Sequence, residues 1–136
     1  MSISYRLKHV ASLVTEGYSV ADIGTDHGYV PIYLLQNNRI SRAIAADVAA
    51  GPLERARKNA CIRGLDDRID CRLGDGLSCV APGEADCIII CGMGGIVMRR
   101  ILDQGIETVL SAKELILSPH RDPELITEFL DANGFS

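Results

Sequence analysis

Acidic residues and glycines share a short stretch, residues 20–28 (VADIGTDHG), near the start of the chain. Gly24 and Gly28 suit a turn in which the backbone approaches a ligand, because a side chain there would hold the ligand away. Free N–H groups at the start of a following helix attract polar ligand atoms. A buried strand, a glycine turn and a helix start in this order predict a nucleotide site.

The spacing within this turn indicates which kind of nucleotide it would bind. A dinucleotide fold uses G-x-G-x-x-G, whereas Gly24 and Gly28 are separated by three residues and Asp22 lies two residues before Gly24. A carboxylate at Asp22 would repel a pyrophosphate and attract a ligand with a cationic amino acid group. S-adenosylmethionine is such a ligand, so Asp22, Gly24, Thr25 and Gly28 are predicted to contact it.

Asp26 and His27 lie inside the same turn. Charged or bulky side chains are costly there unless they face ligand or solvent, so both residues are predicted to be catalytic. For His27, a structural hydrogen bond to a neighbouring strand end is an equal alternative.

Carboxylates also follow the second and third predicted strands. Asp47 comes about twenty residues after the glycine turn, where a carboxylate accepts hydrogen bonds from ribose hydroxyls. A helix cap or a solvated turn is the alternative for Asp47. Asp75 and Gly76 follow the third strand, where the carboxylate could bind an adenine amino group; an ordinary turn is the alternative, since Asp-Gly is a common turn pair.

The fourth predicted strand ends in residues 91–95 (CGMGG). Three glycines in four residues leave the backbone bare, so Cys91, Gly92 and Met93 are predicted to border the ligand. Cys91 is expected to be a small buried residue rather than a nucleophile, because no histidine adjoins it.

Strands and helices are expected to alternate along the chain. The continuous apolar run 87–91 is typical of a central parallel strand covered on both faces. Asp122 is expected to cap the last helix, with Pro123 at its first position. The predicted strands are 19–23, 42–47, 69–73, 86–91 and 114–117; the predicted helices are 4–15, 29–38, 51–64, 96–103 and one beginning at 123. This alternation predicts an α/β fold, a Rossmann-like doubly wound parallel sheet.

Composition limits the size, location and partners of the protein. With 136 residues, 47% of them hydrophobic, the chain suits one domain spanning residues 1–136. A net charge of -4 argues against bulk electrostatic coating of nucleic acid, although a local basic face remains compatible with it. Five cysteines without a C-x-x-C pair speak against a disulfide framework and a zinc site, so no metal and a cytoplasmic location are expected. No apolar run reaches the ~18 residues needed to span a membrane.

Four blocks of the sequence together resemble the TrmK family. They are residues 22–31 (DIGTDHGYVP), 74–77 (GDGL), 91–95 (CGMGG) and 115–120 (LILSPH), and residues 4–7 (SYRL) are similar to the family's S-x-R-L start. The family comprises class I S-adenosylmethionine-dependent tRNA methyltransferases that modify N1 of adenine 22. Cys91 departs from the family's usual alanine. His120 departs from a frequent asparagine, which leaves the loop after the fifth strand without an assigned role.

The resemblance implies a class I methyltransferase core, with S-adenosylmethionine as cofactor and tRNA as substrate. It also implies cofactor contacts for Gly24, Asp47 and Asp75, and places Asp26 and His27 opposite the methyl donor or target base. The family's further strands and C-terminal helical hairpin are not found in residues 1–136, so a catalytic domain lacking its C-terminal part is expected. Methylation of a small molecule and a non-catalytic nucleotide-binding module are the alternative functions. The oligomeric state is left open.

Overall fold

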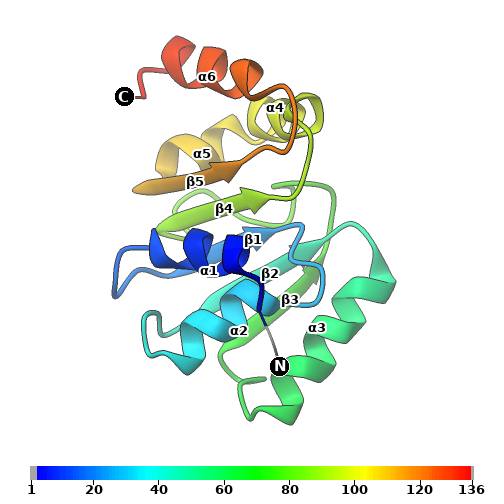
Figure 1. Cartoon of the computed structure of the whole chain (residues 1–136). Helices are drawn as coiled ribbons and strands as arrows, with labels where there is room; N and C mark the ends of the chain where they lie inside the picture. Colours follow the sequence, from blue (N-terminus) through cyan, green and yellow to red (C-terminus); the bar gives the residue numbers. More distant parts are fainter. Residues whose placement is uncertain (1–2, 136) are drawn as a thin grey trace.

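A parallel sheet forms the middle of three layers in the computed structural model, which describes residues 3–135 (Figure 1). The strands are β1 (Val20–Ile23), β2 (Ala43–Asp47), β3 (Ile69–Leu73), β4 (Cys87–Cys91) and β5 (Glu114–Ser118), in the order β3-β2-β1-β4-β5. β1 pairs in parallel with both β2 and β4. The chain reverses its direction of travel across the sheet at β1, and ligands of open α/β sheets bind outside the strand ends at such a point.

Helices cover both faces of this sheet. The helices are α1 (Tyr5–Ser12), α2 (Tyr29–Gln36), α3 (Ala50–Ile62), α4 (Gly95–Gln104), α5 (Ile106–Ser111) and α6 (Pro123–Ala132). Helices α1, α2 and α3 contribute to one buried apolar cluster, and α4, α5 and α6 to another on the opposite face. The predicted Rossmann-like doubly wound parallel sheet is confirmed.

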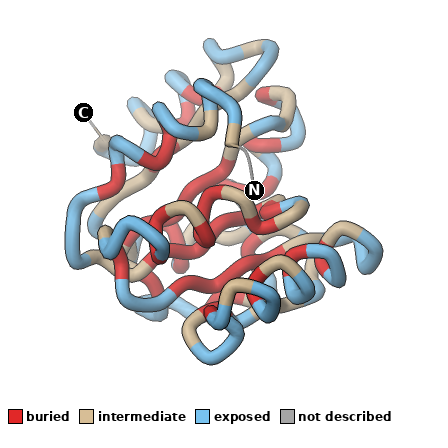
Figure 2. Tube along the Cα trace, turned by 60° about the horizontal axis from the view of Figure 1, so that its bottom comes forward, coloured by how far each residue is buried: buried red, intermediate tan, exposed pale blue. Residues whose placement is uncertain are grey.

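The two apolar clusters share the strands by alternation of their side chains. Val20 and Ile89 join the cluster beneath α1 and α2, whereas Ala21 and Ile88 join the cluster beneath α4 and α6. The three central strands, β2, β1 and β4, are almost wholly buried, and Figure 2 shows such a buried centre within partly exposed helices. Because full burial of an aliphatic side chain contributes about 1.5–3 kcal/mol, this double covering fixes the strand ends firmly.

Helix α1 is shorter than predicted, since it ends at Ser12 rather than near residue 15. The side chain of Ser4 caps its start by accepting a hydrogen bond from the Leu7 N–H at 3.3 Å. Beyond its end, the N–H and Oγ1 of Thr15 donate to the Glu114 carboxylate of β5, at 3.0 and 2.7 Å. These long-range bonds draw Thr15 out of the helical path.

Helix α5 was not predicted, and the predicted cap of α6 is wrong in one respect. The Thr108 hydroxyl of α5 donates to the Val80 carbonyl at 3.0 Å, a contact between segments distant in sequence. Pro123 does begin α6, but the Asp122 side chain makes no capping hydrogen bond, and its backbone adopts a φ of 50°. Among residues 3–135, no helix is long and apolar enough to cross a membrane.

Candidate functional site

A cavity of about 400 Å³ opens at the carboxyl ends of β1, β2 and β4. It brings together most of the predicted site residues, namely Asp22, Gly24, Thr25, Asp26, Asp47, Cys91, Gly92 and Met93. The other predicted residues, His27, Gly28, Asp75 and Gly76, are not part of its lining. Strand ends that are far apart in sequence therefore share one polar cavity, as the parallel sheet requires.

Asp22 lies at the buried floor of this cavity, and the residue is only 3% exposed. The Thr25 hydroxyl donates to its Oδ2 at 2.8 Å. Burial raises the pKa of Asp22 to about 7, the Thr25 hydrogen bond opposes this, and the negative charge of Asp47 adds to it. The carboxyl group is thus costly to ionise alone, and a cation placed beside it would favour its charged form.

Asp47 ties the end of β2 to the glycine turn after β1. Its Oδ2 accepts the Asp26 N–H and its Oδ1 accepts the Ala49 N–H, both at 2.9 Å. Helix α3 begins only after its N-cap residue Ala49, so Asp47 precedes the cap position. A carboxylate has about four acceptor sites, and two remain for ligand hydroxyls.

The two glycines of the turn have different packing reasons. Gly24 has a φ of 76°, and a Cβ there would lie 2.5 Å from the Met93 Cε, so the backbone of Gly24 and the side chain of Met93 meet inside the cavity. Gly28 has the same φ, but its Cβ would lie 3.1 Å from the Cβ of Ala56 in α3. Gly28 therefore permits close packing between helices rather than forming part of the cavity wall.

The glycines after β4 also divide between two tasks. Gly92 lines the cavity. A Cβ at Gly95 would collide with the carbonyl oxygen of Asp122, and the Gly95 N–H donates to the Arg121 carbonyl at 2.7 Å. The expectation that all three glycines leave backbone bare for a ligand is wrong, because Gly95 serves contact with the loop before α6.

His27 is held by α3 and by its neighbour in α2. Arg55 Nη1 lies 3.1 Å from its Nε2, and the ring stacks on Tyr29 with centroids 5.2 Å apart and planes 9° apart. Because a guanidinium only donates, Nε2 accepts and the proton of the neutral ring is assigned to Nδ1. Asp26 Oδ1 lies 3.0 Å from Nδ1, outside hydrogen-bond geometry, and Asn59 Nδ2 donates to the His27 carbonyl at 2.9 Å.

Asp75 and Gly76 lie beside α4. Arg100 Nη1 is 3.7 Å from Asp75 Oδ2, and a Cβ at Gly76 would lie 3.1 Å from Ile101. Asp75 instead lines a neighbouring hollow together with Gln104. Asp75 is exposed, and among residues 3–135 it does not contribute to the lining of the main cavity.

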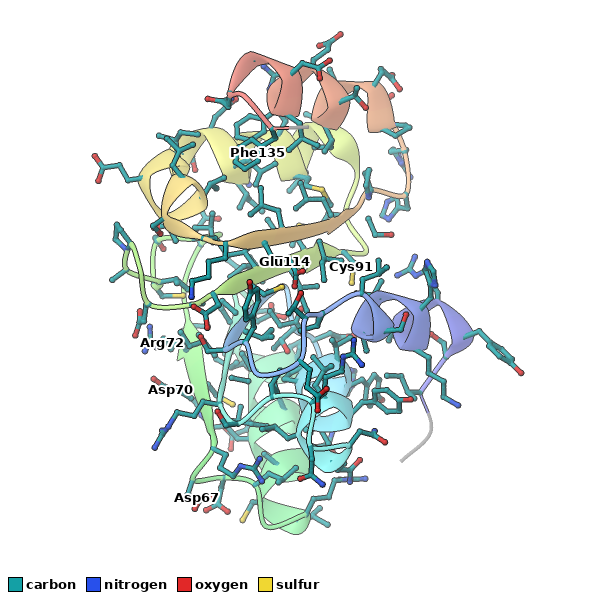
Figure 3. The ribbon with its side chains drawn as sticks, turned by 90° about the vertical axis from the view of Figure 1, so that its left-hand side faces the viewer. Asp67, Asp70, Arg72, Cys91, Glu114 and Phe135 are labelled. Carbon is teal, nitrogen blue, oxygen red and sulfur yellow. The ribbon has the colours of Figure 1, made fainter. Side chains whose placement is uncertain are left out.

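One charged residue of the cavity wall, Arg6, and its apolar neighbour Leu7 were not predicted from the sequence. Both belong to the SYRL segment, which was noted only as part of the family resemblance. Cys91 lies at the end of β4 beside α1 (Figure 3). Burial raises the pKa of the Cys91 thiol to about 11, and the positive charge of Arg6 only partly opposes this. The thiol is therefore protonated at neutral pH, as expected of a wall residue rather than a nucleophile.

His120 is exposed, and its N–H donates to the Met93 carbonyl at 3.0 Å. Its backbone thus helps to hold the β4 turn against the loop after β5. Across residues 3–135, no group of three or more histidine, cysteine, aspartate or glutamate side chains could hold a metal ion. All five cysteines are unpaired.

The sheet order, the glycine turn after β1 and the carboxylate at the end of β2 define a Rossmann-like α/β domain. Comparison with protein families matches residues 3–136 to the family described as "Methyltransferase domain". The chain belongs to this family.

Individual proteins of known sequence or structure are also similar to this chain. The tRNA (adenine(22)-N(1))-methyltransferase of Bacillus subtilis is 39% identical over 130 residues, which cover 96% of this chain and 55% of that protein. The crystal structure of the B. subtilis m1A22 tRNA methyltransferase TrmK matches 97% of this chain and 56% of its own, at 39% identity and a TM-score of 0.91. The structure of M. capricolum TrmK in complex with S-adenosylhomocysteine matches 76% of this chain and 47% of its own, at 39% identity and a TM-score of 0.70. The chain spans about half the length of the curated relative that it matches.

Proposed function

We propose that this chain binds S-adenosylmethionine in the cavity at the ends of β1, β2 and β4. The observation that carries the proposal is the pairing of a buried Asp22 with an Asp47 that retains free acceptor sites, across a glycine turn. A cationic donor suits Asp22, and ribose hydroxyls suit Asp47. The relative from M. capricolum, which binds S-adenosylhomocysteine, supports this assignment.

The other proposed cofactor contacts come either from the backbone of the glycine turns or from side chains of the cavity wall. Gly24, Thr25, Gly92 and Met93 line the cavity and provide close backbone approach, and Cys91 forms an unreactive part of the wall. Gly28 would act indirectly by placing α2 against α3. Asp75 and Gly76 would form an adenine subsite at the edge of the cavity, beyond its lining residues.

The substrate that we propose is N1 of adenine 22 in tRNA, in keeping with the named B. subtilis relative. When bound, S-adenosylmethionine supplies an electrophilic methyl group. Adenine N1 carries a free lone pair, so the protein needs to position the base rather than remove a proton. The methylated ring is cationic, and the exposed carboxylate of Asp26 at the cavity can stabilise that charge. From a tRNA substrate we infer a cytoplasmic location.

His27 fits this proposal as a positioning residue. Its Nε2 accepts from Arg55 and its ring is stacked on Tyr29, so its ring nitrogens are turned toward α3 and toward Asp26 rather than into the cavity. The nearby Nδ1 proton would hold the Asp26 carboxylate electrostatically. His27 then acts through Asp26.

The experiment measures methyl transfer from labelled S-adenosylmethionine to unmodified tRNA, with reverse transcription to locate the product. We expect label in tRNA and a stop at position 22, and neither in a tRNA with guanine at that position. Asp26→Asn keeps a residue type that tolerates the φ of 58° and removes the charge, so transfer should fall more than cofactor affinity. Asp131→Asn, an exposed change in α6, is the matched control. Cofactor binding without transfer to tRNA would reject the substrate proposed here.

A further inference from the structure

The loop between β5 and α6, residues 119–122, is fastened to the turn after β4. The His120 N–H donates to the Met93 carbonyl at 3.0 Å, and the Gly95 N–H donates to the Arg121 carbonyl at 2.7 Å. Both segments leave the sheet at the carboxyl ends of neighbouring parallel strands (Figure 1). Met93 also lines the main cavity, so this loop borders the cavity on the side of β5.

The side chain of Arg121 lies along the turn and has no ionic partner. A Cβ at Gly94 would lie 3.1 Å from the Cγ of Arg121 and 3.4 Å from its Cδ, so the arginine stem occupies the place that a side chain would take. Arg121 is exposed. Its guanidinium makes no ion pair and no hydrogen bond with any other residue between 3 and 135, although Asp122 and Glu124 are close in sequence. The charge is therefore free for a ligand.

Most other arginines of the chain help to hold the fold. Arg39, for example, donates to the Val14 carbonyl at 2.7 Å, and Arg72 donates to the Cys79 carbonyl at 2.7 Å. Arg42 is exposed and unpaired within residues 3–135, as Arg121 is, but it directly precedes β2 and so lies at the amino edge of the sheet, opposite the cavity. Arg121 thus combines a free charge with a place at the cavity rim.

The first turn of α4 adds an apolar surface next to this loop. Ile96 and Val97 are 68% and 43% exposed, and they directly follow Gly95, which is buried against the backbone of residues 121 and 122. A small inorganic anion would leave these two side chains in water. A nucleotide carries an apolar base beside an anionic phosphate, so it suits both parts of the surface.

The proposed cofactor leaves this side of the cavity to the second substrate. Asp47, the proposed ribose partner, lies at the end of β2, and β1 separates β2 from β4. A nucleotide that enters from the side of β4 and β5 as part of a chain brings a phosphate on each side of its base. With a net charge of -4, the protein depends on local cations to attract such a chain.

We propose that the guanidinium of Arg121 binds a phosphate of the tRNA strand next to the target nucleotide, with Ile96 and Val97 packed against an adjoining base, an inference that rests on the proposed function. A guanidinium binds phosphate oxygens through two parallel N–H groups. Phosphate contacts fix the register of a strand. Because the loop is fastened to the turn that lines the cavity, this contact sets the position of the strand relative to the cavity. Arg121 is a positioning residue on the RNA side.

The test measures binding of unmodified tRNA to the 136-residue chain by fluorescence anisotropy, between about 50 and about 200 mM salt. Arg121→Ala should weaken binding about 3- to 10-fold at the lower salt. It should also reduce the slope of log affinity against log salt by about 0.7–0.9, the value for one lost phosphate contact. Arg121→Lys keeps the charge and should restore the slope. Ile96→Ala should weaken binding with an unchanged slope, because it removes an apolar contact only.

Arg42→Ala is the matched control, and it should leave the affinity for tRNA and the salt slope unchanged. All variants should keep the wild-type affinity for S-adenosylhomocysteine in calorimetry and the wild-type thermal unfolding. An unchanged salt slope in Arg121→Ala, or equal effects of Arg121→Ala and Arg42→Ala, would overturn the inference.

Failure of the wild-type chain to bind tRNA would also overturn the inference. Together with intact binding of S-adenosylhomocysteine, that result would leave the proposed cofactor site standing and reject its RNA partner. Failure of the wild-type chain to bind S-adenosylhomocysteine would instead reject the proposed function itself, so the two failures are distinguishable.

Discussion

Replacement of Asp22 by asparagine tests whether the cavity is built around a buried acid that awaits a cation. The pKa of Asp22 is raised from 3.8 to about 7 because the carboxyl is buried. At 1.36 kcal/mol per pKa unit, this difference corresponds to about 4 kcal/mol between the protonated and charged forms. The amide of Asp22→Asn keeps the shape of the side chain and can still accept the hydrogen bond from Thr25, but it carries no charge.

The stability of the wild-type protein should fall as pH rises from about 4 to about 7. In this window the folded protein holds a proton on Asp22 that the unfolded chain has released, so deprotonation favours unfolding. The loss is complete above about pH 7. The difference in free energy of unfolding, Asp22→Asn minus wild type, should therefore increase by up to about 4 kcal/mol from about pH 4 to about pH 8, as measured by urea titration.

Ligand binding should show the opposite dependence on pH. A cationic donor favours the charged carboxylate, so wild-type affinity for S-adenosylmethionine should rise as pH increases toward and through about 7, with release of a proton into the buffer. In Asp22→Asn the affinity should be weaker and this dependence should disappear. Parallel unfolding profiles and the same pH dependence of binding in both proteins would refute the reasoning.

Two further substitutions separate the cavity from the scaffold. Gly24→Ala places a Cβ 2.5 Å from the flexible end of Met93, so that side chain must shift within the cavity and ligand binding should weaken; the φ of 76° should cost about 1–3 kcal/mol in stability. Gly17→Ala, at a φ of 89° with no neighbour within 4 Å, should leave binding unchanged in calorimetry. Arg72→Ala removes the hydrogen bond that Arg72 donates to Glu84 Oε1 at 2.7 Å. Because this bond lowers the pKa of Glu84 to about 2, it stabilises the folded protein only while Glu84 is charged. Urea unfolding of the variant should therefore show a loss of about 1–2 kcal/mol above about pH 4.5, and a smaller loss as pH falls toward about 2. A deficit independent of pH would show that Arg72 acts by packing alone.

Much of the sheet was predictable because strands such as β2 and β4 are short apolar runs that stop at an aspartate or before a glycine. The five strands and five of the helices follow from local patterns, which the core packing reinforces. Helix α5 was missed because its place depends on a distant contact, the Thr108 bond to Val80. The end of α1 was misplaced for the same reason, since Glu114 lies 99 residues from Thr15.

The part of the cavity that is formed by the ends of the strands could be predicted from the sequence. Asp22, Asp47 and Cys91 lie at or near the ends of β1, β2 and β4, which the sheet order makes neighbours, so their convergence required only a parallel arrangement. Arg6 comes from a helix whose position depends on packing against α2 and β5, and no local pattern states that. The second role of Gly95, close contact with the Asp122 carbonyl, likewise exists only in three dimensions.

The central claim is that the cavity above β1 binds S-adenosylmethionine and its product rather than a dinucleotide. Calorimetric titration of the 136-residue chain with S-adenosylhomocysteine and with NAD tests it most directly. One-to-one binding of S-adenosylhomocysteine that is weakened by Asp47→Ala, without detectable binding of NAD, is the result that we predict. Binding of NAD in its place, or affinity for S-adenosylhomocysteine that is indifferent to Asp47, would contradict it.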